Sequence, residues 1–487
     1  MANLSISASP QEIFHIEIRD GKQVLIGVKD KRILFADIPD FVDELGREAF
    51  AGCVNLNSVT VGRKIKKIPS GAFRNCIALE KVNFKRVVLE IGTDAFSGCE
   101  KLTLAKLPEG ITDVGVRAFY GCMGIEELDI PESVKYIGDS AFARCLSLKK
   151  AVLPDSIRGL SPCVFLGCQN LEYIRLPSEM DFIGAEAFRG CASLESIRIP
   201  DTVKTLKSRV FCDCKALKKV SLPASLSEIE TEAFGWCASL DNVTLPARPC
   251  KIGEGAFRGC VSLLSVAFAK DAKLTEKMRL TLKKEAFDGC RSLEKLDGMA
   301  ELYLDGTGIF CGCKSLKTVD LCDDVTDIAE KTFCGCSSLD SLKLGNKVTR
   351  ISARAFEGCL SLREIIFPES LEKIKAYAFC GSGLVSAVLP DSLVSLGEGQ
   401  NAEFPEGYYT DPEYGFDIRI PEEEGGVFSG CSSLKRVILP SSLKKIDNNT
   451  FENCTSLLEI NIPDNVEYHI QVSLLLPDLH SLLPSLV

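Results

Sequence analysis

The chain has 487 residues, of which 46% are hydrophobic and 25% are charged. This composition is typical of folded proteins and excludes a largely disordered chain. Acidic residues outnumber basic ones by 67 to 57, giving a formal net charge of −10, which argues against a general nucleic-acid-binding protein. With only three histidines, most histidine-based catalytic and metal sites are disfavoured, and the 23 cysteines are the unusual feature of the composition.

Residues 1–37 are expected to form an N-terminal β-hairpin cap. Two alternating apolar runs within residues 11–30 flank Asp20-Gly21, a dipeptide typical of a tight hairpin turn. A hairpin at this place would cover the edge of the structure that follows it.

The sequence shows no targeting segment. Its first ten residues have neither the basic segment nor the long apolar stretch of a secretory signal. No stretch reaches about 18 uninterrupted apolar residues, which a membrane-spanning helix requires. We therefore expect a cytoplasmic protein that has no membrane partner.

A phenylalanine, most often preceded by alanine, recurs at a fixed interval along most of the chain. Successive copies lie 23 residues apart, except for seven extra residues after Phe257 and 26 extra residues after Phe379. A cysteine follows three residues later in 16 of the 17 copies, and Ser382 is the exception. The phenylalanines are Phe50, Phe73, Phe96, Phe119, Phe142, Phe165, Phe188, Phe211, Phe234, Phe257, Phe287, Phe310, Phe333, Phe356, Phe379, Phe428 and Phe451. A period repeated this often indicates a stacked repeat architecture.

Each copy predicts a short strand followed by a turn. After Phe188, the pattern Leu194-x-x-Ile197-x-Ile199 alternates apolar and polar positions, so its apolar side chains should face inward. Pro200 then ends the strand, and the hydroxyl of a nearby serine or threonine can satisfy backbone groups of the turn. The segment around the phenylalanine is too short for an independent helix and is expected to form one or two helical or 3₁₀ turns. Stacking would align the strands in one parallel ladder and the phenylalanines in an internal column.

These spacings resemble the leucine-rich repeat, L-x-x-L-x-L-x-x-N, with serine or threonine replacing most asparagines. The finer pattern Ala-Phe-x-x-Cys-x-x-Leu, followed by proline and by pairs such as Ile137-Gly138 and Ile183-Gly184, is similar to the BspA-like family of these repeats. The resemblance implies an α/β solenoid, a leucine-rich repeat array with a parallel β ladder and short helical or 3₁₀ turns on the opposite side. It also implies a binding protein, since members resemble bacterial and protist surface adhesins or uncharacterised binding scaffolds.

The expected solenoid covers residues 38–470 with about 17 repeats, and residues 471–487 are expected to form a capping tail. Two insertions interrupt the repeats, near residues 270–283 and over residues 398–426. The first insertion is locally basic and is interpreted as a solvated loop.

The second insertion contains nine acidic residues and one basic residue, together with Tyr408, Tyr409 and Tyr414. Loops that interrupt a rigid scaffold often carry specific contacts. Acidic and tyrosine side chains together suit a basic peptide or protein surface. The alternative interpretation is an acidic loop or a decayed repeat without a binding role.

The repeated cysteines are expected to be reduced thiols in the core. Each would have two equivalent neighbours about 4.8 Å away, so no unique disulfide pattern follows. Cys311, Cys313, Cys334 and Cys336 lie on adjacent repeats, and four sulfurs are a ligand set that zinc accepts. The usual C-x₂₋₄-C spacing is absent and the repeat already accounts for Cys313 and Cys336, so we expect no metal.

The sequence carries no known nucleotide-binding, hydrolase or metalloprotease motif. His15, His469 and His480 all lie outside the central repeats, so a histidine-assisted nucleophile would have to use a residue near one end. We therefore expect neither an enzyme nor a cofactor.

Residues eight and ten positions after each phenylalanine should face outward from the ladder. These positions vary between copies while the inward positions do not, so they are free to specify a partner. The middle of the chain places a modest basic stretch there, made of Lys150, Tyr173, Arg175, Arg198 and Lys219. This stretch predicts binding to an acidic or mixed protein surface, and the alternative is a face that serves solubility alone.

The sequence thus favours a monomeric, non-enzymatic scaffold that binds a protein partner through the ladder face, the acidic insertion or both. The alternative hypothesis is a surface adhesin-like protein that binds host or matrix proteins after export by an unconventional route. Neither hypothesis involves a nucleic acid.

Overall fold

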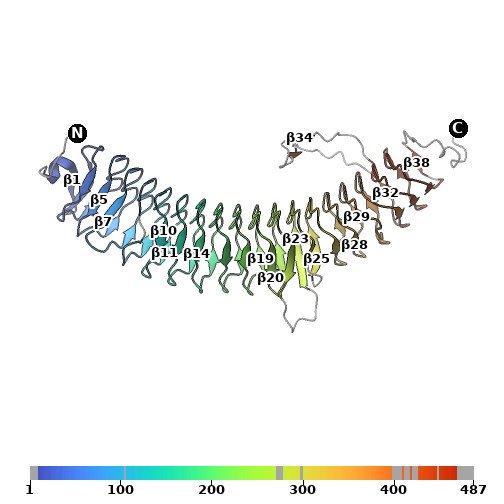
Figure 1. The fold of residues 1–487 in the computed structure, drawn as a ribbon, viewed down its shortest axis with the longest axis horizontal. Helices are drawn as coiled ribbons and strands as arrows, with labels where there is room; N and C mark the ends of the chain where they lie inside the picture. Colours follow the sequence, from blue (N-terminus) through green and yellow to red (C-terminus); the bar gives the residue numbers. More distant parts are fainter. Residues whose placement is uncertain are drawn as a thin grey trace. The chain divides into compact units, whose positions relative to one another are not determined.

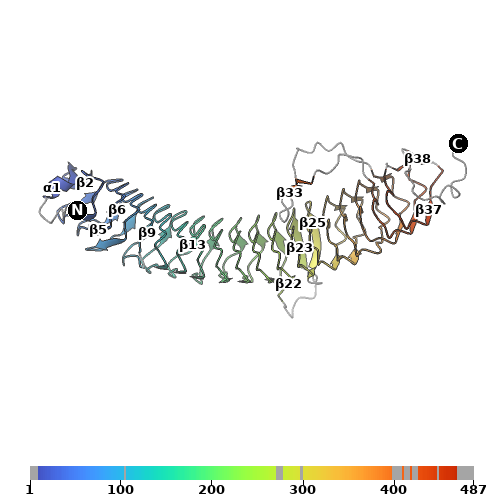
Figure 2. The same cartoon turned by 45° about the horizontal axis from the view of Figure 1, so that its top comes forward.

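The computed structural model describes residues 9–103, 106–269, 278–296, 300–397, 409–410, 417–418, 426–446, 449–464 and 466–468. The chain divides into two compact units, unit 1 (Met1–Lys273) and unit 2 (Leu274–Val487). Each unit is a β-solenoid in which successive 23-residue repeats form stacked rungs (Figure 1 and Figure 2). The solenoid with parallel strand pairing that the repeat predicts is confirmed.

Unit 1 begins with a single turn of helix and a hairpin. The helix α1 (Pro10–Ile13) leads into β1 (Phe14–Arg19), which pairs antiparallel with β2 (Lys22–Val28). Asp20 and Gly21 connect the strands with φ values of 50° and 75°, as a two-residue hairpin turn requires. The part of the chain that the structure describes contains no helix that could span a bilayer.

The hairpin joins the first rung in two ways. Strand β2 pairs in parallel with β4 (Glu44–Leu45), and the ring of Phe14 lies edge-on to Phe50 at a centroid distance of 6.1 Å. The hairpin therefore covers an end of the apolar interior that the first rung would otherwise expose.

Most described rungs contribute two short strands rather than the single strand that the sequence predicts, although the rung of Phe356 contributes none to the first ladder. In most rungs the strand of the first ladder begins eight residues after the phenylalanine, and the strand of the second ladder ends at the apolar residue eighteen places after it. In unit 1 the first ladder contains β3 (Phe35–Asp37), β5 (Ser58–Val61), β7 (Lys81–Phe84), β10 (Glu127–Asp129), β12 (Lys150–Val152), β14 (Tyr173–Arg175), β16 (Ser196–Arg198), β18 (Lys219–Ser221), β20 (Asn242–Leu245) and β22 (Ser265–Phe268). Its second ladder contains β4, β6 (Lys67–Ile68), β8 (Glu90–Ile91), β9 (Asp113–Val114), β11 (Tyr136–Ile137), β13 (Gly159–Leu160), β15 (Phe182–Ile183), β17 (Thr205–Leu206), β19 (Glu228–Ile229) and β21 (Cys250–Ile252).

Unit 2 repeats this arrangement. Its first ladder contains β24 (Lys295–Leu296), β26 (Thr318–Asp320), β28 (Ser341–Lys343), β31 (Ser386–Val388), β35 (Arg436–Ile438) and β37 (Glu459–Asn461). Its second ladder contains β23 (Met278–Lys283), β25 (Ala300–Asp305), β27 (Asp327–Ile328), β29 (Arg350–Ile351), β30 (Lys373–Ile374), β32 (Ser395–Leu396), β36 (Lys445–Ile446) and β38 (Glu467–Tyr468). The predicted capping tail over residues 471–487 lies outside the described residues.

Both predicted insertions are described in part. Strand β23 lies within the first insertion and pairs in parallel with β25 in the second ladder of unit 2. In the second insertion, β33 (Tyr409–Thr410) pairs antiparallel with β34 (Asp417–Ile418).

The expected helical or 3₁₀ turns around the phenylalanines are absent from the described rungs, so this part of the prediction is wrong. In the first rung, overlapping turns are closed by the bonds from Cys53 N to Phe50 O and from Leu56 N to Cys53 O. The residues two before and two after the phenylalanine, Glu48 and Gly52, have φ values of 58° and 73°. Left-handed residues at this spacing interrupt any helix, and the freed N–H of Phe50 donates to Ala72 O in the next rung.

The turn after the strand is formed as the proline and the hydroxyl residue predict. The carbonyl of Pro154 accepts a hydrogen bond from the N–H of Ile157, which closes the turn. The hydroxyl of Ser156 reaches back to the preceding rung and donates to Val134 O at 2.6 Å, as Ser225 does to Val203 O. The serine therefore stabilises contacts between rungs as well as the turn itself.

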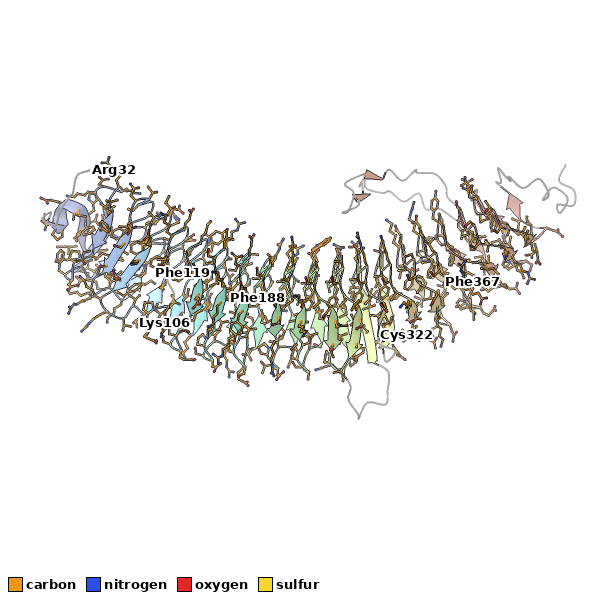
Figure 3. All side chains as sticks on the ribbon, in the orientation of Figure 1. Arg32, Lys106, Phe119, Phe188, Cys322 and Phe367 are labelled. Carbon is orange, nitrogen blue, oxygen red and sulfur yellow. The ribbon has the colours of Figure 1, made fainter. Side chains whose placement is uncertain are left out.

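The predicted phenylalanine column is the interior of both units. In unit 1, consecutive rings from Phe50 to Phe257 are stacked with centroids 5.1–5.9 Å apart, and the rings are almost parallel. Phe119 and Phe188 are fully buried members of this column (Figure 3). In unit 2 the rings from Phe287 to Phe451 stack in the same way.

Replacing Phe188 with alanine should destabilise unit 1 by about 3–5 kcal/mol, because it removes a buried ring and leaves a cavity between two neighbours. Phe188 has no exposed surface and stacks on Phe165 and Phe211 at 5.7 and 5.5 Å. Urea denaturation followed by circular dichroism measures the loss. Ser196→Ala, at an exposed position of the same rung, should change stability by less than about 0.5 kcal/mol. An equal loss of stability in the two variants would contradict the assignment of Phe188 to the buried column.

Candidate functional site

The outward face of the first ladder in unit 1 is the surface that the sequence predicts to bind a partner. Strands β14 and β16 have the alternation expected for it, with the central residues Ile174 and Ile197 buried and the residues on either side exposed. Strand β12 pairs in parallel with β14, and β16 pairs with β18, so equivalent residues of successive rungs lie side by side. The rungs of β14 and β16 therefore each present two side chains of this face to solvent.

The structure places all five predicted residues on this face. Lys150 lies directly beside Tyr173 in the register of β12 and β14, and Lys219 lies beside Ser196 in the register of β16 and β18. Tyr173 is 52% exposed, which is unusual for a large aromatic side chain. Within the described residues, neither Lys150 nor Lys219 forms an ion pair, so both ammonium groups are available to a partner.

The two arginines are less available than the sequence suggests. The guanidinium of Arg175 donates to both carboxylate oxygens of Asp155 at 3.0 and 3.1 Å and to Leu153 O at 3.2 Å. Arg198 makes a longer contact of 3.5 Å with Asp201. Arg175 is therefore held by its own rungs, whereas Arg198, whose side chain is 79% exposed, is free to turn toward a partner.

The face is mixed in charge rather than basic. Exposed Glu172 and Glu195 directly precede β14 and β16, and Lys149 is paired with Glu126 at 3.1 Å. Such pairs on exposed surface contribute little to stability. They do impose an alternating pattern of charge that only a complementary surface would match.

The second ladder carries exposed aromatic side chains that the sequence analysis missed. Tyr136 on β11 and Phe182 on β15 are 47% and 49% exposed. Gly159, on the rung between them, leaves room for the Phe182 ring, since a Cβ there would lie 2.3 Å from it. Their sequence signal is the variable residue directly before the repeated apolar residue of this strand. A two-residue strand has too little alternation to reveal it.

The structure gives little information on the three tyrosines predicted in the acidic insertion. Tyr408 and Tyr414 lie outside the described residues, and Tyr409 is described only as part of the backbone of β33.

The repeated cysteines form a second internal column whose geometry explains the residue type. From Cys76 to Cys260 in unit 1, each thiol donates to the carbonyl of the phenylalanine 26 residues earlier at 3.1–3.3 Å. That carbonyl also accepts the N–H of the cysteine in its own rung, as in the bond from Cys53 N to Phe50 O. A small, weakly polar donor is therefore required at this position.

Burial keeps these thiols protonated. It raises the pKa of Cys99 and of Cys168 to about 12, and it raises the pKa of Cys191 well above its ordinary value. A thiolate is the reactive form of cysteine. The column thiols are therefore structural groups and poor nucleophiles.

The four cysteines considered as zinc ligands do not converge. Cys313 and Cys336 donate inward to Phe287 O and Phe310 O, while Cys311 and Cys334 are part-exposed. Among the described residues, no group of three or more histidine, cysteine, aspartate or glutamate side chains is placed to hold a metal ion. Of the histidines, the structure describes only His15, which lies on β1.

Comparison with known proteins identifies the repeat type. A family model described as the BspA type leucine rich repeat region matches residues 31–149, 158–278, 280–402 and 419–474. No curated protein matches the chain.

Several solved structures are similar to the chain. A leucine-rich repeat protein from Bacteroides ovatus is 25% identical, with a TM-score of 0.52 over 96% of this chain and 100% of that one. A leucine rich cell surface protein from Faecalibacterium prausnitzii is 20% identical, with a TM-score of 0.33 over 94% of this chain and 96% of that one. The pneumococcal vaccine antigen PcpA is 18% identical, with a TM-score of 0.36 over 75% of this chain and 95% of that one.

A thiol titration of the native protein should separate the two kinds of cysteine. At pH 8 the column thiols from Cys76 to Cys260 should stay unmodified by a thiol reagent, because they are buried and their raised pKa values keep them protonated. The part-exposed Cys163, Cys311, Cys322, Cys334 and Cys380 should be the first to react. After unfolding in denaturant, all 23 cysteines should react. Rapid modification of column thiols in the folded protein would contradict their assignment.

Proposed function

We propose that this chain, which belongs to the BspA-type leucine-rich-repeat family, is a non-enzymatic scaffold that binds a protein partner through the first ladder of unit 1. The observation that carries the proposal is the contrast between two sets of positions. The interior positions hold phenylalanine, cysteine and leucine in almost every rung, whereas the outward positions of the first ladder vary. Folding constrains the first set and leaves the second free to specify a partner.

The chemistry of the face supports a protein partner. A stable protein interface buries about 800 Å² on each side, which a small pocket cannot provide but a series of adjacent rungs can. Tyr173 offers the amphipathic aromatic surface that is enriched in protein interfaces. Lys150 and Lys219, two cations without an ion pair within the described residues, lie on a face that also carries the exposed acidic side chains of Glu172 and Glu195. This mixture suits a partner with both acidic and basic side chains.

The double variant Lys150→Glu/Lys219→Glu should weaken binding about tenfold or more, a change of about 1.4 kcal/mol, because it places carboxylates where the partner would meet cations. The partner would first be captured from the source cells with the intact chain. Its affinity would then be measured by titration calorimetry with purified components. Arg175 is a poorer choice for the test, because its contact with Asp155 would also be lost.

The matched control is Lys135→Glu/Lys204→Glu. These lysines are also exposed and also belong to unit 1, but they lie next to β11 and β17 of the second ladder. The control makes the same change in net charge and should leave the affinity unchanged. An equal loss of affinity in both double variants would mean that the change in net charge alone weakens binding. Unchanged affinity in both would mean that the partner binds another surface.

Deleting residues 398–426 tests the other predicted contact in the same assay. Loss of the partner with this deletion alone would make the acidic insertion the recognition element. Capture of cell-surface or matrix proteins in place of cytosolic ones would favour an adhesin-like role for the same surface.

A further inference from the structure

We propose that Cys311 and Cys334 form an oxidisable dithiol, a modification site that a low-molecular-weight disulfide converts into an intramolecular disulfide between two rungs of unit 2. Each cysteine directly follows a column phenylalanine, and the rings of Phe310 and Phe333 are stacked at 5.5 Å. This position is distinct from that of the buried cysteine column, which lies two residues further along each rung.

The backbone already has the spacing that a disulfide needs. The N–H of Gly289 donates to Cys311 O and the N–H of Gly312 donates to Cys334 O, both at 2.8 Å, so the two cysteines occupy equivalent places in register. Neighbouring strands of a sheet lie about 4.8 Å apart. Disulfides join residues whose Cα atoms are about 4.4–6.8 Å apart. The spacing of adjacent rungs therefore lies within the range that a disulfide accepts.

The two thiols occupy the same place on adjacent rungs. The thiol of Cys334 lies 3.7 Å from Oε2 of Glu357 in the next rung. Both cysteines are part-exposed, so a small reagent can reach them. By contrast, Cys53 and Cys76 also neighbour each other, but both are fully buried.

The fold does not require a thiol at this position. Other rungs place Arg189, Gly235 and Arg258 there, with the stacking of their phenylalanines preserved. In unit 1 the position holds one cysteine, Cys212, whose neighbours in the stack are Arg189 and Gly235. Cys311 and Cys334 are thus adjacent cysteines that the repeat itself does not demand.

The reaction is two successive thiol–disulfide exchanges. The thiolate of Cys334 attacks one sulfur of the small disulfide, forms a mixed disulfide and releases one small thiolate. Cys311 then loses its proton to solvent and attacks the Cys334 sulfur, which releases the second small thiolate. The two protein thiols are oxidised to one disulfide, and the small disulfide is reduced to two thiols.

The surroundings of the pair set the conditions for this reaction. Interaction with the neighbouring Cys334 side chain, together with burial and the nearby charge of Asp288, raises the pKa of Cys311. Cys311 is therefore assigned as the second thiol to react, and oxidation should be faster at pH 9 than at pH 7. Because Asp288 and Glu357 repel anions, a neutral disulfide is the better reagent.

The test treats the folded full-length chain with bis(2-hydroxyethyl) disulfide, blocks the remaining thiols with an alkylating reagent, and maps cysteines by proteolysis and mass spectrometry. The expected product is a cross-link between Cys311 and Cys334, lighter than the reduced peptides by two hydrogen atoms. If both thiols remain free after prolonged treatment at pH 9, and are therefore both found alkylated, the proposal is overturned. A cross-link that uses Cys313 or Cys336 in their place would overturn it as well.

Variants identify the sulfurs independently of the fragment assignment. Cys311→Ser should stop the reaction at the mixed disulfide on Cys334, and Cys334→Ser should abolish the cross-link. Cys212→Ser, at the same repeat position without a neighbouring cysteine, should leave it unchanged. A cross-link that persists in Cys311→Ser would contradict the pairing. Thermal melts followed by circular dichroism establish whether each variant is folded. If a variant is not folded, the peptide mapping of the unaltered chain decides whether Cys311 and Cys334 form the cross-link.

Discussion

The structure depends on the burial of one phenylalanine per rung against the phenylalanines of the adjacent rungs. A single 23-residue repeat has no other apolar partner of that size, so it cannot form a core alone. Ring centroids in unit 1 lie 5.1–5.9 Å apart, slightly more than the about 4.8 Å that separates paired strands. The two spacings are close enough for one stack of rungs to satisfy both ring stacking and ladder hydrogen bonding. Extra residues are compatible with the column only where they leave this spacing unchanged: after the 26 extra residues that follow Phe379, its ring still stacks on Phe428 at 5.6 Å.

The column also creates a requirement for the cysteines. Turns on either side of each phenylalanine leave its carbonyl inside the rung, away from water. The carbonyl of Phe165 accepts the N–H of Cys168 at 3.1 Å and the thiol of Cys191 at 3.3 Å. A buried carbonyl has two lone pairs, and leaving one unsatisfied is unfavourable. Ser382, the exception among the repeated cysteines, is also a small donor and is buried.

The sequence predicts most of the structural features that recur from repeat to repeat. The stacked phenylalanines, the parallel strands and the outward positions of the first ladder all follow from apolar residues at fixed spacing, as in the copy that begins at Phe188. The second ladder was missed because each of its strands has two or three residues in most rungs. The predicted helical turns were wrong because left-handed residues such as Glu186 and Arg209 carry no sequence signal of their own. Glycine at this place, as in Gly71, would have been a clearer warning.

The candidate binding surface is harder to predict, because its properties depend on contacts between rungs. Arg175 appears in the sequence as one cation of a basic stretch, but Asp155, twenty residues earlier, holds it in place. Glu172 and Glu195 make the same face mixed in charge.

The strict frame nonetheless separates residues that folding requires from residues that it does not. Cys191 occupies a position where almost every rung has cysteine, so its presence follows from the carbonyl that it satisfies. Cys311 occupies a position where other rungs have arginine or glycine, so folding does not explain it. The same reasoning applies to Lys150 and Tyr173 on the first ladder. In a repeat protein, departures at tolerant positions are therefore where selection for function can act without loss of the fold.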